Sequence, residues 1–317
     1  MTYQPTAISN DLGNLSHLPG WVTSGRAETF ETVAFRSGAA LTVLDQLISD
    51  PRHGVPVKLL ANRLALSAAT VTSKLEGRLA READIRDAYH LAPPGEARGP
   101  DGDLLAFWRE AVRLRVSGTG EIVDLVGLDF AGEVGAWLDV GLERARTHGP
   151  LSGCVATLRA VLEVDDRAER TACLLSDLVL ARALNRRTLL PVLAQRMTKA
   201  ALRDLVAEGQ GADLAVEVRI LEAIEESIRL ARDLARRAYT LRTVAPKLRA
   251  KGSDAAVDLF LTEDAVAPAS VLSPRIRGTS IPMTDRAARR FCDRLVELGV
   301  ARELTGRPSF RLYGIAS

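Results

Sequence analysis

Hydrophobic residues recur at helical spacing along most of this chain. Between residues 30 and 48, Val33, Leu41 and Leu44 fall close to a period of 3.6, which predicts an amphipathic helix. Stretches that contain Pro or Gly separate it from similar patterns. These predict further helices over residues 56–75, 82–91, 103–115, 133–146, 153–163 and 166–184, with Pro191 near the start of one more.

The longest predicted helix covers residues 213–243. Its apolar residues recur at alternating steps of three and four, from Leu221 and Ile224 through Ile228 and Ala231 to Ala238. This heptad-like seam lasts only about two and a half repeats, which is short for a coiled coil. We therefore expect this helix to pack inside a bundle, where its small alanines permit close approach of other helices.

The pattern changes character after Pro246. A short amphipathic helix is predicted over residues 254–261, and a Pro- and Ser-rich stretch follows it. Thr284 is a good N-cap for a helix that runs to about Leu298. Two short runs, 300–304 and 309–313, flank a Gly-containing turn and predict a β-hairpin. Helices followed by a basic hairpin are typical of a winged helix-turn-helix.

The helix predicted over residues 285–298 has two distinct faces. Its apolar residues, among them Phe291 and Leu295, lie on one side. Arg286, Arg289 and Arg290 lie on the other side, in the first half of the helix. This polarity suits a recognition helix that enters a DNA groove by its N-terminal end.

Composition favours an all-α fold class. Together with the pattern of elements, it predicts a multi-helix bundle with a C-terminal winged helix-turn-helix and a short β-hairpin wing. Aromatic residues make up only 4% of the 317, and Ala, Leu and Arg dominate. The length suggests about two domains of roughly 150 residues each. We expect a flexible N-terminus over residues 1–20, a helical bundle domain over 21–245 and a winged helix-turn-helix domain over 246–317.

The N-terminal residues and the length of the hydrophobic runs indicate where the protein is located. The first 20 residues have neither a basic nor an apolar region of the kind found in signal peptides. The sequence contains no uncharged apolar run of about 18 residues. We therefore predict a cytoplasmic protein with no membrane partner.

Charge is distributed unevenly. From Arg229 to the end there are 17 Lys and Arg against 9 Asp and Glu, a net charge of +8, which leaves −6 for residues 1–228. A basic end on an acidic body favours contact with an anionic partner, either duplex DNA or an acidic protein surface. Attraction between the two parts of the same molecule is the alternative. Lys247 and Lys251 lie in the basic stretch that leads into the tail and could form an electrostatic track beside the wing.

Enzyme motifs are missing from the sequence. It contains no GxGxxG, Walker A, GxSxG or HExxH pattern. The three cysteines form no CxxC pair and no zinc-type spacing with histidine, so we expect them to be buried thiols of a reducing compartment. Asp84 and Asp87 are three residues apart, as a pair of metal ligands can be, but no second cluster of ligands accompanies them. His90 is also three residues from Asp87, so the two side chains could form a hydrogen bond. We predict no catalytic residue, no metal and no cofactor.

Two groups of residues resemble a known family. The first is Ile85–Leu91 (IRDAYHL) with Trp108-Arg109, and the second is residues 244–252 (VAPKLRAKG) with the tail from Asp285 to Gly314. They resemble the uncharacterised bacterial family called domain of unknown function 1403, over most of the chain. That resemblance implies no activity.

The tail is also similar to that of a second uncharacterised helical family and to the winged tails of Fic-domain proteins. Fic enzymes transfer AMP with a histidine followed by a glycine-rich turn. The nearest segment here, residues 148–153 (HGPLSG), lacks the aromatic, the acidic residue and the closing arginine of that pattern. The Fic resemblance therefore implies a catalytically inactive relative, with His148 as a loop residue.

Three hypotheses follow for function. In the first, a non-enzymatic accessory protein binds DNA, with Arg286, Arg289 and Arg290 at base edges or phosphates. Residues of the hairpin would then lie along the DNA backbone or the minor groove; they are Arg302, Arg307 and Arg311. In the second, the tail is a docking module of a protein-interaction scaffold. In the third, the chain is a diverged, inactive Fic-like helical protein.

Overall fold

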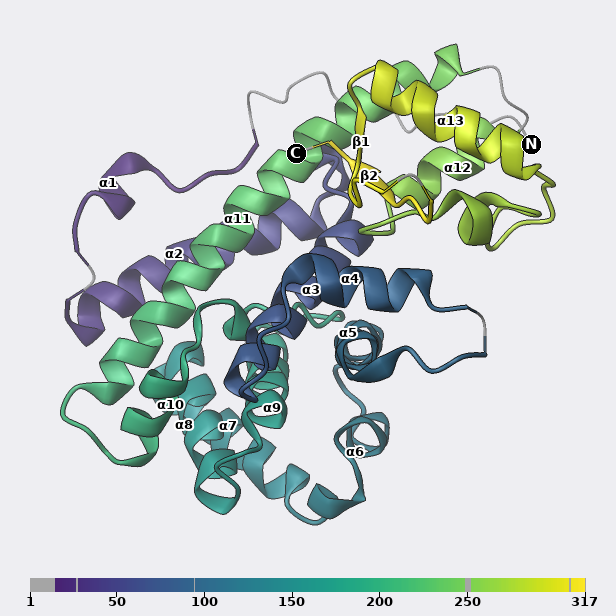
Figure 1. Cartoon of the computed structure of the whole chain (residues 1–317). Helices are drawn as coiled ribbons and strands as arrows, with labels where there is room; N and C mark the ends of the chain where they lie inside the picture. The colour runs from purple at the N-terminus through teal and green to yellow at the C-terminus, as the bar shows by residue number, and fades with distance from the viewer. Residues whose placement is uncertain (1–14, 27, 94, 249–251, 308, 317) are drawn as a thin grey trace.

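The computed structural model describes residues 15–26, 28–93, 95–248, 252–307 and 309–316. The described chain is mainly helical, and its C-terminus carries a small antiparallel hairpin (Figure 1). None of its helices is long and apolar enough to cross a membrane, as far as the described residues go. The predicted all-α class is therefore confirmed.

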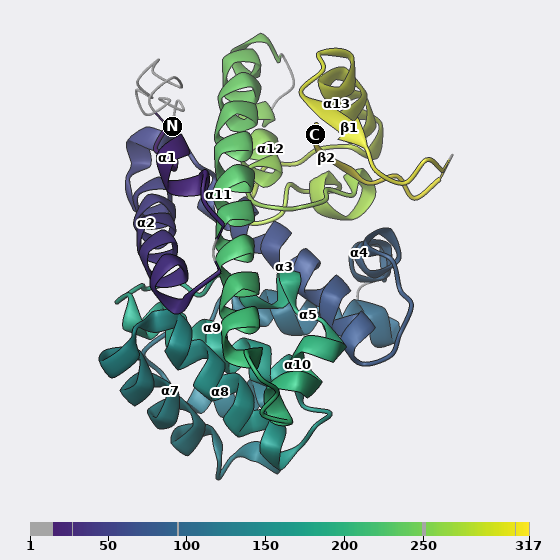
Figure 2. The same cartoon turned by 90° about the vertical axis from the view of Figure 1, so that its left-hand side faces the viewer.

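Two long helices lie side by side along one flank of the molecule. They are α2 (Phe30–Ser49) and α11 (Ala212–Val244), and both views show them adjacent (Figures 1 and 2). Thr29 caps α2 by accepting a hydrogen bond from the backbone N–H of Thr32. The seam residues of α11 are buried, as a helix packed within a bundle requires. A short helix, α1 (Gly20–Thr23), precedes α2, and Leu15 before it is buried in the core.

The lower part of the body is a layer of three helices, α7 (Val134–His148), α8 (Pro150–Val164) and α9 (Glu169–Ala183). Two glycines allow α7 and α8 to approach closely, because a Cβ on Gly153 would lie 2.6 Å from the carbonyl oxygen of Gly141. Helix α9 is buried along almost its whole length and forms the centre of the body.

A second group of helices links this layer to the C-terminus. It consists of α3 (Val57–Leu75), α4 (Glu82–Leu91), α5 (Gly99–Ala111) and α6 (Gly120–Val126). Buried Trp108 of α5 donates a hydrogen bond of 3.0 Å to the hydroxyl of Thr72 in α3. The remaining short elements of the body are η2 (Pro51–His53), η3 (Leu128–Phe130), η4 (Leu193–Arg196), α10 (Lys199–Val206) and η5 (Ala245–Lys247).

The C-terminal unit packs against the upper half of α11 (Figure 2). Its elements are α12 (Ser253–Phe260), the π-helical turn η6 (Pro268–Leu272), α13 (Asp285–Glu297), β1 (Ala301–Glu303) and β2 (Tyr313–Ile315). Ala301 pairs with Ile315 in the hairpin, and Val266 makes an isolated antiparallel bridge with Tyr313. Buried apolar side chains of the body and of this unit form one continuous core. The C-terminal unit is therefore packed against the body through an apolar interface.

Most predicted helices appear within a few residues of their expected bounds, but three differences are instructive. The helix predicted over residues 103–115 begins earlier, at Gly99 of α5, because Pro100 fits the first turn of a helix. Helix α6 was missed. The second hairpin strand lies at Tyr313–Ile315 instead of 309–313, because Phe310 takes a left-handed backbone conformation and interrupts the ladder.

Candidate functional site

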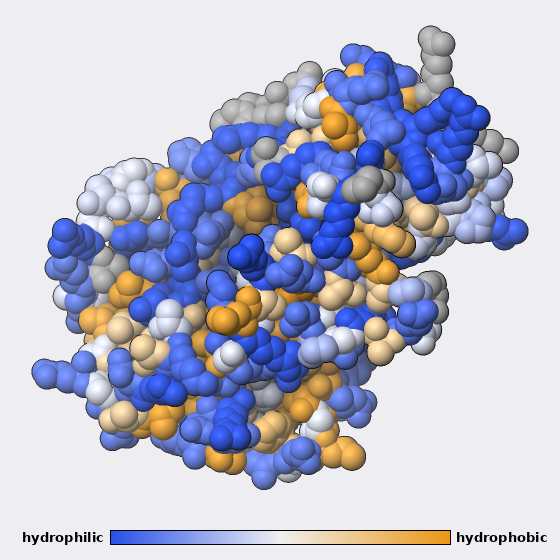
Figure 3. All heavy atoms as spheres, in the orientation of Figure 1, coloured by the Kyte–Doolittle hydropathy of each residue, from blue (hydrophilic) through white to orange (hydrophobic). Residues whose placement is uncertain are grey.

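Helix α13 exposes the arginine face that its sequence pattern predicts. The side chain of Thr284 accepts a hydrogen bond from the backbone N–H of Ala287 and begins the helix. Ala288, Phe291 and Leu295 are buried against the rest of the C-terminal unit. The opposite face lies in solvent, where hydrophilic residues gather over this end of the molecule (Figure 3). Exposed on that face are Arg286, Arg289 and Arg290.

These three arginines are only weakly neutralised by their neighbours. Arg289 pairs with Asp285 one turn away at 2.9 Å, and both side chains are about half exposed or more. Exposed pairs of this kind are worth only a few tenths of a kcal/mol. Within the described residues, no carboxylate lies in ion-pair range of Arg286 or Arg290. The first half of α13 therefore presents cationic charge to solvent.

A basic loop extends this face before α13 begins. The backbone N–H of Ile276 donates to the carbonyl of Ile281 at 3.0 Å, which folds the loop back on itself and leaves Arg275 and Arg277 exposed. Gly252 lies beneath the loop with φ of +82°, and a Cβ there would come within 2.7 Å of Ile281. Lys247 is exposed as well, whereas Lys251 lies outside the described residues.

The hairpin arginines are placed differently from those of α13. Arg307 lies 3.8 Å from Asp87 of α4, and buried Arg86 donates to the carbonyl of Leu304 at 3.1 Å. Arg302 is exposed on the strand beside half-buried Arg63. Arg311 lies 3.8 Å from Glu303 of β1. One side of the hairpin thus contacts the helical body.

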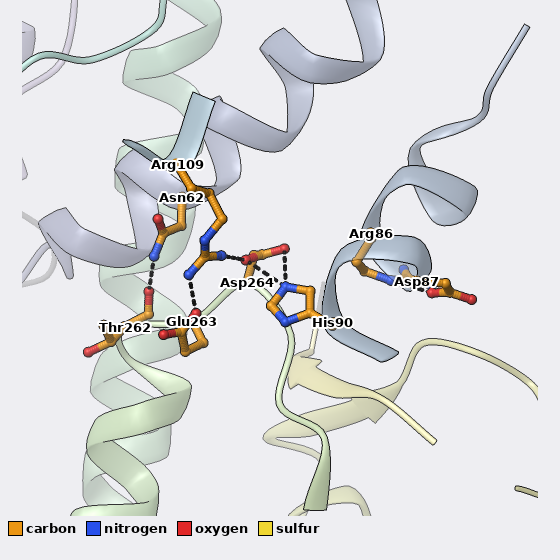
Figure 4. Close-up of polar contacts among 8 residues, drawn as sticks. All are labelled: Asn62, Arg86, Asp87, His90, Arg109, Thr262, Glu263 and Asp264. Carbon is orange, nitrogen blue, oxygen red and sulfur yellow. Dashed lines mark hydrogen bonds and ion pairs between the residues drawn. The ribbon is translucent and has the colours of Figure 1, made fainter. Parts of the chain in front are cut away.

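A buried ionic network joins the body to the segment after α12 (Figure 4). Arg109 of α5 forms ion pairs with both Glu263 and Asp264. His90 of α4 lies with its Nε2 3.2 Å from either oxygen of Asp264. The side-chain amide of Asn62 donates to the carbonyl of Thr262 at 2.7 Å. Three body helices therefore hold the short segment from Thr262 to Asp264.

The charges in this network compensate one another. Burial by itself raises the pKa of Asp264, but His90, Arg109 and Arg63 outweigh that effect and hold the pKa well below its ordinary value. Burial lowers the pKa of Arg109, yet Asp264 and Glu263 reverse the effect and raise it. Burial is also the main cause that lowers the pKa of Arg63. Asp264 and Arg109 therefore stay ionised, and their ion pair joins the C-terminal unit to the body.

A cleft of about 570 Å³ opens next to this network. It lies between the end of α4, the turn η6, one side of α13 and residues 309–313. Arg289 and Asp293 of α13 line it together with Phe310 and Arg311. Phe310 is 74% exposed, which is unusual for a phenylalanine at the edge of a cleft.

Among the described residues, His90 and Asp87 have other partners than the hydrogen bond between them that their spacing allows. His90 contacts Asp264, 174 positions away, whereas Asp87 contacts Arg86 and Arg307. His148 ends α7 in an exposed position, with its Nδ1 2.8 Å from the hydroxyl of Thr147. Sequence reasoning missed the roles of Arg109, Asp264 and Phe310. The signals available were the charged pair at 263–264 straight after a short helix and an aromatic residue within a basic turn.

The cysteines are free and buried, as expected. Burial raises the pKa of Cys154, Cys173 and Cys292, so their thiols stay protonated. No group of His, Cys, Asp or Glu in the described part of the chain is arranged to hold a metal ion.

These features define a helical protein with a basic C-terminal helix and hairpin fixed to its body by buried ion pairs. One family model matches residues 6–315, and the chain belongs to that family, described as Protein of unknown function (DUF1403). A comparison with curated proteins gave no match. The two groups of residues that resemble this family meet at the junction, where Arg86 and Asp87 contact Leu304 and Arg307.

Proposed function

We propose that this protein binds duplex DNA through α13, which acts as the recognition helix of a winged helix-turn-helix. The observation that carries the proposal is the exposed set Arg286, Arg289 and Arg290 on the first half of a helix whose other face is buried. A helix N-terminus with exposed arginines suits both phosphate contacts and bidentate contacts with guanine. In this proposal the protein is a non-enzymatic accessory factor.

The order of elements in the C-terminal unit supports the winged-helix interpretation. Helix α12 is followed by the bridge residue Val266, then by η6, α13 and the two strands. Val266 pairs with Tyr313 on the edge of β2 away from β1, at the position of a third strand. This is the sequence of helices and strands expected for a winged helix, with η6 in the place of its second helix.

The basic surface beside α13 extends the proposed contact. Arg275 and Arg277 in the preceding loop and Lys247 before it are exposed and would lie along the phosphates. Arg302 and Arg307 contribute less in this arrangement, because their side of the hairpin faces α3 and α4. The proposal therefore assigns DNA contact chiefly to α13 and its preceding loop.

Charge removal on α13 tests the proposal. The variant R286A/R290A and a control variant R113A/R146A each lose two exposed arginines, and the control positions lie on the body. Affinity for a labelled random-sequence duplex is measured by fluorescence anisotropy at low salt. We expect R286A/R290A to bind at least about tenfold more weakly than wild type, and the control to stay within about twofold. Equal losses in both variants, or no binding by wild type, would overturn the proposal.

The scaffold hypothesis has one observation in its favour. The hairpin is already docked on the body through Arg307 and Asp87 and through Arg86 and Leu304. In that hypothesis an acidic surface covers the α13 arginines, but within the described residues this chain leaves them exposed. An acidic partner protein would therefore be needed. A variant R286A/R290A that still binds duplex like wild type would favour this alternative.

A further inference from the structure

The cleft beside the ionic network has features that duplex binding by α13 does not use. Its volume of about 570 Å³ lies in the range typical of small-molecule sites. Cationic, aromatic and hydrogen-bonding side chains converge on it from three parts of the chain; they are His90, Arg289, Asp293, Phe310, Arg311 and Tyr313. We propose that this cleft binds one nucleoside phosphate, with its base against Phe310 and its phosphate held by Arg289 and Arg311.

Phe310 is the aromatic surface of the proposed site. Its backbone has φ of +57°, a conformation that costs a bulky residue free energy, and its ring is 74% exposed to solvent. The ring contributes little to the fold, because most of it is exposed to solvent. Strained residues cluster at binding sites, and an exposed ring next to arginines is a typical stacking surface for a base.

The two arginines provide charge for the phosphate. Arg289 comes from α13 and Arg311 from the segment before β2, so they approach the cleft from different elements. Their present ionic partners are partly exposed carboxylates, Asp285 at 2.9 Å and Glu303 at 3.8 Å. Arg311 also donates to the carbonyl of Arg307 at 3.3 Å and hydrogen bonds to Tyr313. A phosphate group carries more charge than either carboxylate and accepts bidentate hydrogen bonds from guanidinium groups. It can therefore displace these weak pairs.

Polar groups with partners within the protein lie among the apolar residues that line the cleft. The hydroxyl of Tyr313 donates to Asp293 at 3.1 Å, and the ring of Tyr313 is buried. His90 also lines the cleft, and its contact with Asp264 fixes the orientation of its ring. These groups offer fixed donors and acceptors to the edge of a base, which favours a nucleotide over an anion that lacks a ring.

The inference goes beyond duplex binding and does not depend on it. Arg289 is the residue that the cleft shares with the α13 face, whereas Arg286 and Arg290 do not line the cleft. Variants at Phe310 and Arg311 therefore test the cleft, and the variant R286A/R290A tests the duplex contact. If one of the two proposals fails its test, the other can still be tested independently.

Isothermal titration calorimetry of the full chain tests the cleft directly. The separate probes are AMP, GMP, adenosine and inorganic phosphate. We expect at least one nucleotide to bind more tightly than adenosine or phosphate by about tenfold, since only a nucleotide uses both the ring and the arginines. A short single-stranded oligonucleotide is a further probe, because it also carries bases and phosphates. Tighter binding of this strand than of AMP, sensitive to Phe310, would assign the cleft to an unpaired nucleotide, and weaker binding would assign it to a free one.

Matched variants decide the roles within the cleft. F310A should weaken nucleotide binding by about tenfold, whereas F35A, which removes another exposed phenylalanine, should leave it unchanged. R311A should weaken AMP binding and leave adenosine binding unchanged, and R286A/R290A should preserve both. Absence of nucleotide binding at millimolar concentration, or nucleotide binding that F310A and R311A leave intact, would overturn the inference.

Discussion

Arg109 of α5 and Asp264, 155 positions further along the chain, form a buried ion pair between the helical body and the C-terminal unit. The side chain of Asp264 has no exposed surface, and that of Arg109 is 3% exposed. The pair sets how the C-terminal unit sits on the body. It thereby fixes one wall of the cleft and keeps the arginine face of α13 directed to solvent.

Removal of the charge on Asp264 should destabilise the protein strongly. D264N keeps the size of the side chain but removes the buried counter-charge of Arg63 and leaves Arg109 with Glu263 as its remaining ionic partner. We expect the free energy of unfolding at pH 7, measured by urea denaturation, to fall by about 3 kcal/mol or more. The exposed pair Arg113 and Glu110, 3.6 Å apart, provides the control, and E110Q should change stability by less than about 0.5 kcal/mol.

The difference in the free energy of unfolding between wild type and D264N should disappear at low pH. The pKa of Asp264 is lowered in the folded state, so its stabilisation is present at neutral pH and declines as the pH falls below its ordinary value of 3.8. A difference between the two proteins that stays constant through this range would contradict the ionic account of the junction.

Burial in the centre of the body should favour the neutral form of Asp177. Burial raises its pKa well above the ordinary value, and its Oδ1 accepts hydrogen bonds from the backbone N–H groups of Val192 and Leu193. Its Oδ2 is buried and has no hydrogen-bond partner within the described residues. D177N should therefore cost less than about 1 kcal/mol, whereas D177L, which removes both acceptors, should cost about 2–4 kcal/mol. Equal losses in the two variants would show that the carboxylate is ionised.

Glu217 of α11 should make stability depend on pH between 4.5 and 7. Burial raises its pKa from 4.5 to about 7, with Asp213 adding to this shift and Arg144 opposing it. Because the folded pKa is the higher one, stability is greatest below 4.5 and is lost as the pH rises through 7. E217Q should match wild type at pH 4.5 and exceed it by about 1 kcal/mol at pH 8. Identical pH profiles for the two proteins would contradict this assignment.

The contact between α7 and α8 should tolerate no side chain at Gly153. An added Cβ would lie 2.6 Å from the Cβ of Ala145 and from the carbonyl oxygen of Gly141, so the helices must move apart. We expect G153A to lower the melting temperature and to cost about 2 kcal/mol or more. G135A in α7 is the control, since nothing lies within 4 Å of its Cβ, and it should be neutral or slightly stabilising. A neutral G153A would show that the helices are not held this closely.

Periodicity predicted the helices well because most of them bury one apolar face. Helix α4 begins and ends where its pattern and flanking residues predict, at Glu82 and Leu91. Helix α6 is only seven residues long, too short for a period to stand out. The second hairpin strand shifted towards the C-terminus because Phe310 adopts a backbone conformation that its residue type rarely takes.

The junction could not be predicted in the same way. Nothing local relates His90 and Arg109 to Asp264, and charged residues in such segments are usually exposed. Only the packing of α4 and α5 against the segment after α12 brings the three together. The arginine face of α13, in contrast, follows from the positions of its residues on one helix, and those residues are exposed.

The salt dependence of duplex binding tests the central proposal most directly. Six exposed basic residues form the proposed contact, namely Lys247, Arg275, Arg277, Arg286, Arg289 and Arg290. If each neutralises one phosphate, the logarithm of affinity should fall with the logarithm of salt concentration at a slope of about −5.4 for wild type and about −3.6 for R286A/R290A. A wild-type slope near zero, or the same slope in both proteins, would contradict the assignment of DNA contact to α13.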